Sequence, residues 1–160
     1  MKILLILLLS LHAFASVKEQ MFDLFQNENY EKACNLGHRS LYKNNKDEQY
    51  ISVYAFSCLK SDYIDRLSNP IALLKFSQEA RANSAYFSII LMQKKLLYHA
   101  LIDGYSLGEL NLPTTNHVLS KVFDYYVALG QNEKKASYTF RDKTDSRLSY
   151  KLYLEKNPRL

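Results

Sequence analysis

Apolar side chains recur at intervals of three and four residues along most of the chain, and this spacing predicts amphipathic helices. The sequence holds only 4 Gly and 3 Pro. Obligatory turns are therefore few, which favours long helices over a many-stranded sandwich. The apolar pattern predicts six helices, at residues 17–26, 30–42, 48–60, 70–81 and 85–103 and from about 118 to 129.

Polar residues and one glycine mark the expected ends of these helices. Asp47 is expected to cap the helix that follows it. Asn69 is expected to cap the next helix, with Pro70 at the first helical position, where its missing N–H costs nothing. Gly104 suits the left-handed position that ends a helix, and a residue among 114–116 is expected to cap the last one.

The period changes near the C-terminus. Residues 137–141 and 148–154 alternate between polar and apolar side chains around a polar turn at 142–146, which predicts a β-hairpin. The competing interpretation is a last helix, because Leu148 and Leu152 lie four residues apart. We favour the hairpin and expect a mainly α protein, with helices paired as antiparallel hairpins and a small C-terminal β-hairpin.

The N-terminus has the order of a cleavable secretory signal. Lys2 precedes a nearly unbroken aliphatic run over residues 3–11, and residues 13–15 then offer small side chains at the two positions that a signal peptidase reads. We expect cleavage after Ala15 and a periplasmic or secreted protein. The alternative is a retained membrane anchor, but the run is shorter than the roughly 20 residues that span a bilayer, and no later run is longer.

Charge is distributed unevenly along the chain. The net charge is +5, and residues 134–160 hold eight basic residues against three acidic ones, whereas residues 16–133 are close to neutral. The sequence therefore divides into a signal peptide at 1–15, a helical domain at 16–133 and a basic C-terminal tail at 134–160.

The basic tail interleaves cations with tyrosines, a combination that grips polyanions. It suggests a module that binds an anionic membrane or another polyanion, although a solvated terminal surface would look the same. Export argues against nucleic acid as the partner. The candidate basic residues are Arg141, Lys143, Arg147 and Lys151.

Two segments resemble the tetratricopeptide-like repeat family and its Sel1-type relatives. Residues 29–33 are similar to the start of that motif's second helix, with Ala33 at the small packing position, and residues 69–72 look like a second copy. Ala72 follows Ala33 by 39 residues, whereas the family repeats every ~34. The resemblance covers about residues 18–103 and implies a non-catalytic scaffold whose concave face binds a peptide or protein.

Tyrosine is abundant, with 13 copies, and Trp is absent. Aromatic side chains on a groove wall bind peptides or sugars well, so Tyr50, Tyr54 and Tyr63 are candidate groove residues. In a chain without Trp they also serve as the large core residues, and we favour the core for most of them.

Cys34 and Cys58 are the only cysteines, an even number in a chain expected to be exported. On the hairpin arrangement they lie in consecutive helices, which would allow a disulfide worth about 3 kcal/mol. The alternative is two buried thiols. No His or Cys stands at ligand spacing, so no metal site is expected.

Catalytic signals are weak. His99 precedes Asp103 by one helical turn, so the pair could act as a general base with its orienting carboxylate in a small envelope hydrolase. More often such a pair is a histidine satisfied near a helix C-terminus. The chain has no Gly-rich phosphate loop, and we expect no cofactor. The favoured interpretation is an exported helical scaffold, not an enzyme, that binds a protein or peptide partner in the cell envelope.

Overall fold

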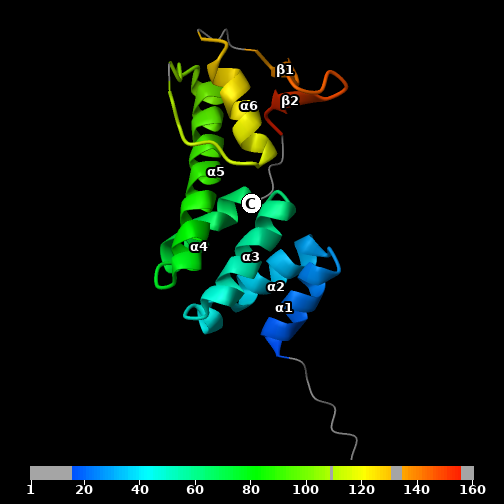
Figure 1. The fold of residues 1–160 in the computed structure, drawn as a ribbon, viewed down its shortest axis with the longest axis vertical. Helices are drawn as coiled ribbons and strands as arrows, with labels where there is room; N and C mark the ends of the chain where they lie inside the picture. Colours follow the sequence, from blue (N-terminus) through cyan, green and yellow to red (C-terminus); the bar gives the residue numbers. More distant parts are fainter. Residues whose placement is uncertain (1–15, 109, 131–134, 156–160) are drawn as a thin grey trace, which may run out of the picture.

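The computed structural model describes residues 16–108, 110–130 and 135–155. These residues form six α-helices, two short 3₁₀ helices and one two-stranded antiparallel sheet, so the expected mainly helical fold with a C-terminal β-hairpin is confirmed (Figure 1). The helices are α1 (Val17–Gln26), α2 (Tyr30–Ser40), η1 (Leu41–Asn44), α3 (Glu48–Lys60), η2 (Ile64–Leu67), α4 (Ser68–Leu73), α5 (Gln78–Asp103) and α6 (Val118–Val127), and the strands are β1 (Ser137–Arg141) and β2 (Ser149–Tyr153).

The buried side chains form two clusters, and both include residues of the long helix α5, which Figure 1 shows running past α4 at one end and α6 at the other. The N-terminal cluster joins α1 to α4 with the first half of α5. The C-terminal cluster joins the second half of α5 with α6 and the hairpin. The hairpin is therefore packed onto the helices and is not a free tail. The predicted boundary at 133–134 lies outside the described residues.

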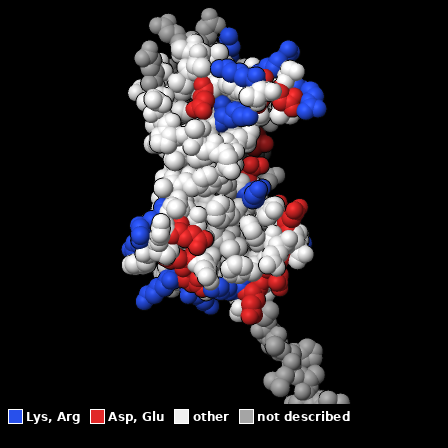
Figure 2. Space-filling view, in the orientation of Figure 1, with Lys and Arg blue, Asp and Glu red and all other residues white. Residues whose placement is uncertain are grey.

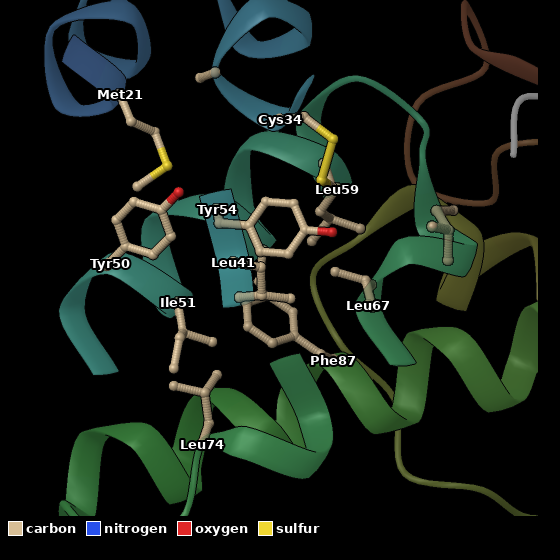
Figure 3. Close-up of a cluster of buried hydrophobic side chains, with 14 of the residues drawn as sticks. Met21, Cys34, Leu41, Tyr50, Ile51, Tyr54, Leu59, Leu67, Leu74 and Phe87 are labelled. Atoms are coloured by element: carbon tan, nitrogen blue, oxygen red, sulfur yellow. A yellow bond between two sulfur atoms is a disulfide. The ribbon is translucent and has the colours of Figure 1, made fainter. Parts of the chain in front are cut away.

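Helices α2 and α3 pack closely because Gly37 has no side chain. A Cβ added at Gly37 would lie 2.5 Å from Cδ2 of Tyr54, a distance that real Cβ atoms do not reach. Cys34 of α2 and Cys58 of α3 are joined by a disulfide, with their Cα atoms 4.7 Å apart. The expected disulfide is thus confirmed. Figure 3 shows Tyr54 and the disulfide within the N-terminal cluster.

A buried polar chain fixes the connection between α5 and α6. Gln93 and Ser120 are both fully buried. The Ser120 hydroxyl donates to Oε1 of Gln93 at 2.6 Å, and Nε2 of Gln93 donates to the carbonyl of Pro113 at 3.2 Å. Thr115 Oγ1 lies 2.7 Å from Ser120 Oγ. Each polar group in this chain has a partner, as burial requires.

Three predicted helix boundaries are wrong. The helix expected over 70–81 ends at Leu73, and α5 begins at Gln78 instead of residue 85, so the break between the two predicted helices lies at 74–77 and not at 82–84. Asn69 does not cap α4, because η2 runs directly into that helix and Leu67 holds the cap position. His117 caps α6 in place of residues 114–116, with its Nδ1 accepting the N–H of Leu119 at 3.2 Å.

The caps expected at Asp47 and Gly104 are confirmed. The Asp47 side chain accepts the N–H of Tyr50, and Gly104 ends α5 with φ at 68°. None of the helices formed by the described residues is long and apolar enough to cross a membrane. The predicted signal peptide lies outside those residues.

Candidate functional site

The candidate groove tyrosines do not form a groove. Tyr50 and Tyr54 are fully buried, so the favoured interpretation of them as core residues is confirmed and the alternative of groove residues is wrong (Figure 3). The Tyr50 hydroxyl donates to the carbonyl of Gly37 at 3.2 Å, and the Tyr54 hydroxyl lies 3.2 Å from Nδ1 of His38. Burial raises the pKa of Tyr54 to about 12. Both side chains are core residues.

Tyr63 lies at the surface but is engaged by its neighbours. Its hydroxyl donates to the Glu31 carboxylate at 3.0 Å, which ties the segment after α3 to the start of α2. The guanidinium of Arg66 stacks over its ring at 4.1 Å and donates to the Asn35 side chain at 2.8 Å. These contacts make Tyr63 part of the bracing between helices.

The most distinctive backbone arrangement is the turn between α4 and α5. The carboxylate of Glu48, at the start of α3, accepts the backbone N–H groups of three consecutive residues at 2.9, 2.7 and 2.9 Å. These residues are Lys75, Phe76 and Ser77. From the other side, the Arg81 guanidinium donates to the carbonyls of Lys75 and Phe76. The turn is therefore held through both its donors and its acceptors.

The Glu48 carboxylate is strongly favoured in its ionised form. The N–H of Phe76, together with those of its two neighbours, lowers the Glu48 pKa from 4.5 to about 2. A carboxylate that accepts several backbone N–H groups is stabilised as the anion. The carboxylate consequently stays ionised, and the turn keeps this anchor, well below the pH at which an ordinary glutamate is protonated.

The turn between α4 and α5 and the helix η1 lie at the end of the molecule opposite the hairpin (Figure 1), and each carries an exposed aromatic side chain. Phe76 is 73% exposed and Tyr42, on η1, is 88% exposed. An open hollow of about 820 Å³ lies between the two turns and is lined by residues 43–49, Ser77 and Glu79. We call residues 41–49 and 74–79 the aromatic end.

The hairpin supplies the second distinctive surface. Tyr138 and Phe140 of β1 face inward and pack in the C-terminal cluster, with Tyr138 edge-on to Tyr126 of α6 at 5.1 Å. Thr139 pairs with Lys151, and Arg141 pairs with Ser149. Because side chains alternate along a strand, Arg141 and Lys151 share the opposite, outward face.

Asp142 fastens the hairpin turn. Its side chain is 1% exposed, and its Oδ1 accepts the N–H and hydroxyl of Thr144 and the N–H of Asp145 at 2.6 to 3.0 Å. Its Oδ2 accepts Lys121 Nζ at 2.9 Å and the Tyr150 hydroxyl at 2.7 Å. Thr144, Lys121 and Tyr150 together hold the pKa of Asp142 well below its usual range.

The four candidate basic residues fall into two groups. Arg141 and Lys151 stand on the outward face of the strands, and Lys143 and Arg147 lie in the turn that joins them. Arg147 pairs with Asp145 at 2.8 Å, and Lys143 Nζ lies 5.6 Å from the ring of Tyr125. Figure 2 shows Lys and Arg side chains gathered over the hairpin, with some Asp and Glu side chains among them, and a largely uncharged band between this region and the charged N-terminal helices.

The candidate catalytic pair is open to solvent. His99 Nε2 and Asp103 Oδ2 are 3.7 Å apart, and their side chains are 49% and 60% exposed. The His99 ring stacks on Tyr105 at 4.5 Å. The pKa of a catalytic general base is ordinarily shifted by burial or by charged neighbours. Within the described ranges, no group of three or more His, Cys, Asp or Glu side chains is arranged to hold a metal ion.

Sequence reasoning missed Phe76, Tyr42 and the two carboxylates, Glu48 and Asp142, that shape the surfaces. Local pattern assigned Phe76 to the interior of a continuous helix. The one local signal was Ser77, whose hydroxyl accepts the N–H of Ala80 as an N-cap. Glu48 acts across 27 to 29 residues, which no local pattern reports.

Comparisons of the chain with protein-family models, with curated proteins and with solved structures find no match. The resemblance to tetratricopeptide-like repeats therefore stays a prediction from the sequence. Function has to be argued from the aromatic end and the hairpin.

Proposed function

We propose that this chain is an exported, non-catalytic helical scaffold and that a protein partner docks on its aromatic end. The observation that carries the proposal is Phe76, a large apolar side chain that is 73% exposed on a turn whose backbone is fixed by Glu48 and Arg81. The partner would offer an apolar pocket for this ring.

The fold itself gains little from the Phe76 side chain. The hydrogen bonds that hold the turn involve the backbone of residues 75–77. Nζ of Lys75 lies over its ring at the surface, 5.2 Å from the centroid. An alanine would satisfy the same backbone. A phenyl ring held in water at this position is better explained by a partner than by folding.

Pre-organisation makes such a ring an efficient anchor. Binding energy at protein interfaces is concentrated in a few residues, often aromatic, that fill a pocket in the partner. Ordering a mobile loop on binding costs free energy, and a turn that is already fixed avoids that cost. Tyr42 and the adjoining hollow extend the contact area beyond the single ring.

Export is supported by the disulfide between Cys34 and Cys58, because disulfides persist in oxidising compartments such as the periplasm and the extracellular space. The order of charged, aliphatic and small residues at the N-terminus agrees with this. Paired helices that pack around a small residue also suit the tetratricopeptide-like scaffold inferred from sequence.

The test is site-specific photo-crosslinking in the native cell envelope. A benzoyl-phenylalanine placed at position 76 is expected to form an adduct of discrete mass with one protein, and the same label at position 42 is expected to capture the same protein. Tyr98 is the matched control, since it is an aromatic residue on α5 with 51% exposure. Absence of a discrete adduct at both positions, or an equal adduct from position 98, would overturn the proposal.

A substitution separates binding from folding. Phe76→Ala is expected to abolish capture of that partner by the label at position 42, while leaving the melting temperature of the protein unchanged. Val118→Ala, at a site that is 53% exposed, should change neither quantity. Undiminished capture by Phe76→Ala would exclude the ring as the anchor.

A further inference from the structure

The outward face of the hairpin is basic and exposed. Strands β1 and β2 pair in antiparallel register from Ser137 opposite Tyr153 to Arg141 opposite Ser149. The inward face is packed in the C-terminal cluster. Among the described strand residues, the outward face carries no carboxylate. Its exposed members are Thr139, Arg141, Ser149, Lys151 and Tyr153.

The two outward cations are not neutralised by neighbouring acids. Lys151 lies diagonally opposite Arg141 in the strand pair, and residues in such diagonal positions are about 7–8 Å apart. Within the described part of the chain, neither residue forms an ion pair. Glu155 follows β2 by two residues and is exposed. The outward face therefore presents two adjacent positive charges to solvent.

The two acidic residues of the hairpin turn already have ion-pair partners. Asp142 is buried and forms an ion pair with Lys121 of α6. Asp145 pairs with Arg147 within the turn. Lys143 Nζ, which lies over the ring of Tyr125, adds a third exposed cation. Because Asp142 is buried and paired with Lys121, it does not offset the exposed cations of the hairpin.

One aromatic side chain flanks these cations. Tyr153 is 53% exposed on the outward face, with Lys151 Nζ 5.5 Å from its ring centroid. Tyrosine beside Lys and Arg settles readily at the boundary between lipid headgroups and acyl chains.

We propose that the outward face of the hairpin docks on the surface of a bilayer that contains anionic phospholipid. Arg141 and Lys151 contact headgroup phosphates, and Tyr153 rests at the headgroup level. Export, which the Cys34–Cys58 disulfide supports, favours this ligand over a nucleic acid. A hairpin fixed to α6 through Asp142 and Lys121 presents the cations in a constant arrangement.

This docking goes beyond the proposed function and uses a different part of the molecule. The aromatic end belongs to the N-terminal cluster and the hairpin to the C-terminal one. Lipid docking would hold the scaffold at a membrane while the aromatic end stays available for a protein. Either proposal can fail without the other.

The test is co-sedimentation with vesicles. The full chain is expressed and purified after export. It is then mixed with phosphatidylcholine vesicles that contain either no phosphatidylglycerol or about 30% of this anionic lipid. We expect binding only to the anionic vesicles, and less binding as salt is raised. Arg141→Gln with Lys151→Gln should weaken it about 25-fold, because each cation near an anionic surface contributes about fivefold.

Matched variants decide the interpretation. Lys32→Gln with Lys60→Gln removes two exposed cations from the N-terminal helices and should leave vesicle binding unchanged. Tyr153→Ala keeps the charge and should still weaken binding. Equal binding to neutral vesicles, or equal losses from both double variants, would overturn the proposal. Tighter binding to a single-stranded oligonucleotide than to the vesicles would overturn the lipid assignment in favour of a general polyanion site.

Discussion

The carboxylate of Glu48 accepts the backbone N–H of Phe76 at 2.7 Å, although the two residues lie 28 positions apart. This contact joins the start of α3 to the turn that precedes α5. It replaces the helix hydrogen bonds that an unbroken 70–81 segment would have made. One acidic side chain thereby decides both where a helix is interrupted and which aromatic ring is displayed.

Replacing Glu48 with Gln should loosen this turn and weaken partner capture at position 76. The amide oxygen can still accept, but the charge that three N–H groups favour is lost. Hydrogen exchange of the amides of residues 75–77 should become faster by about tenfold or more, since their protection depends on the local closed state. Glu79→Gln, in the first turn of α5, is the control and should leave these amides protected. Unchanged exchange in Glu48→Gln would show that the turn closes without the carboxylate.

The pH dependence of this contact has a definite sign. The pKa of Glu48 falls from 4.5 to about 2 on folding, so its stabilising effect is fully present above pH 4.5 and is lost as the pH falls from there towards 2. The difference in urea midpoint between the wild type and Glu48→Gln should therefore be larger at pH 7 than at pH 2.5. A difference that grows on acidification would contradict the assigned contact.

The local pattern of apolar and capping residues correctly predicted the elements whose boundaries depend on residues nearby in the sequence. The ranges of α1 and α3, the Asp47 cap and the hairpin follow from periodicity and capping residues within a few positions. The hairpin was preferred over a helix because of alternation, and the register of Thr139 with Lys151 bears this out. Such features need no knowledge of the tertiary structure.

The features that sequence reasoning missed depend on residues distant in sequence. Ile71, Leu74 and Gln78 continue one helical line across the break, so periodicity alone cannot reveal the turn that Glu48 imposes. Tyr50 and Tyr54 sit on the buried side of α3, and their burial depends on α2 approaching closely at Gly37. Exposed and buried aromatics look alike until that packing is known.

Reducing the disulfide should destabilise the protein by about 3 kcal/mol, because Cys34 and Cys58 are 24 residues apart and the bond restricts the unfolded chain. Urea unfolding with and without reductant measures the difference. The variant with both cysteines changed to Ala should match the reduced wild type approximately and should not respond to reductant. An equal response of both proteins to reductant would mean that the effect does not arise from this bond.

Gly37→Ala should destabilise the protein by about 1–3 kcal/mol, the usual range for overpacking a core. The added Cβ would meet Tyr54 Cδ2 at 2.5 Å, and Tyr54 is fully buried, so α2 and α3 must separate. Alanine has a higher helix propensity than glycine. If small shifts relieved the clash, the variant would therefore be more stable than the wild type. Chemical denaturation distinguishes the two outcomes. Lys32→Ala, an exposed site on the same helix, should remain within ±0.5 kcal/mol of the wild type.

His117 makes the start of α6 sensitive to pH. Its Nδ1 accepts the N–H of Leu119 and can do so only while that nitrogen is unprotonated. Burial lowers the pKa of His117 below 6.5, so the unfolded chain takes up a proton before the folded protein does. Stability from this group is present above pH 6.5 and declines as the pH falls below that value.

His117→Asn separates the cap from the titration. Asparagine is a strong N-cap that does not titrate, so this variant should keep the stability of the wild type near pH 7.5 and lose less of it between pH 6.5 and pH 5. His117→Ala should lose about 1 kcal/mol at pH 7.5, the usual value of an N-cap. Thermal unfolding of the three proteins at both pH values tests this, with His99→Asn as the control at an exposed histidine. If His117→Asn and the wild type decline in parallel, the pH dependence belongs to other groups and His117 acts as a cap alone.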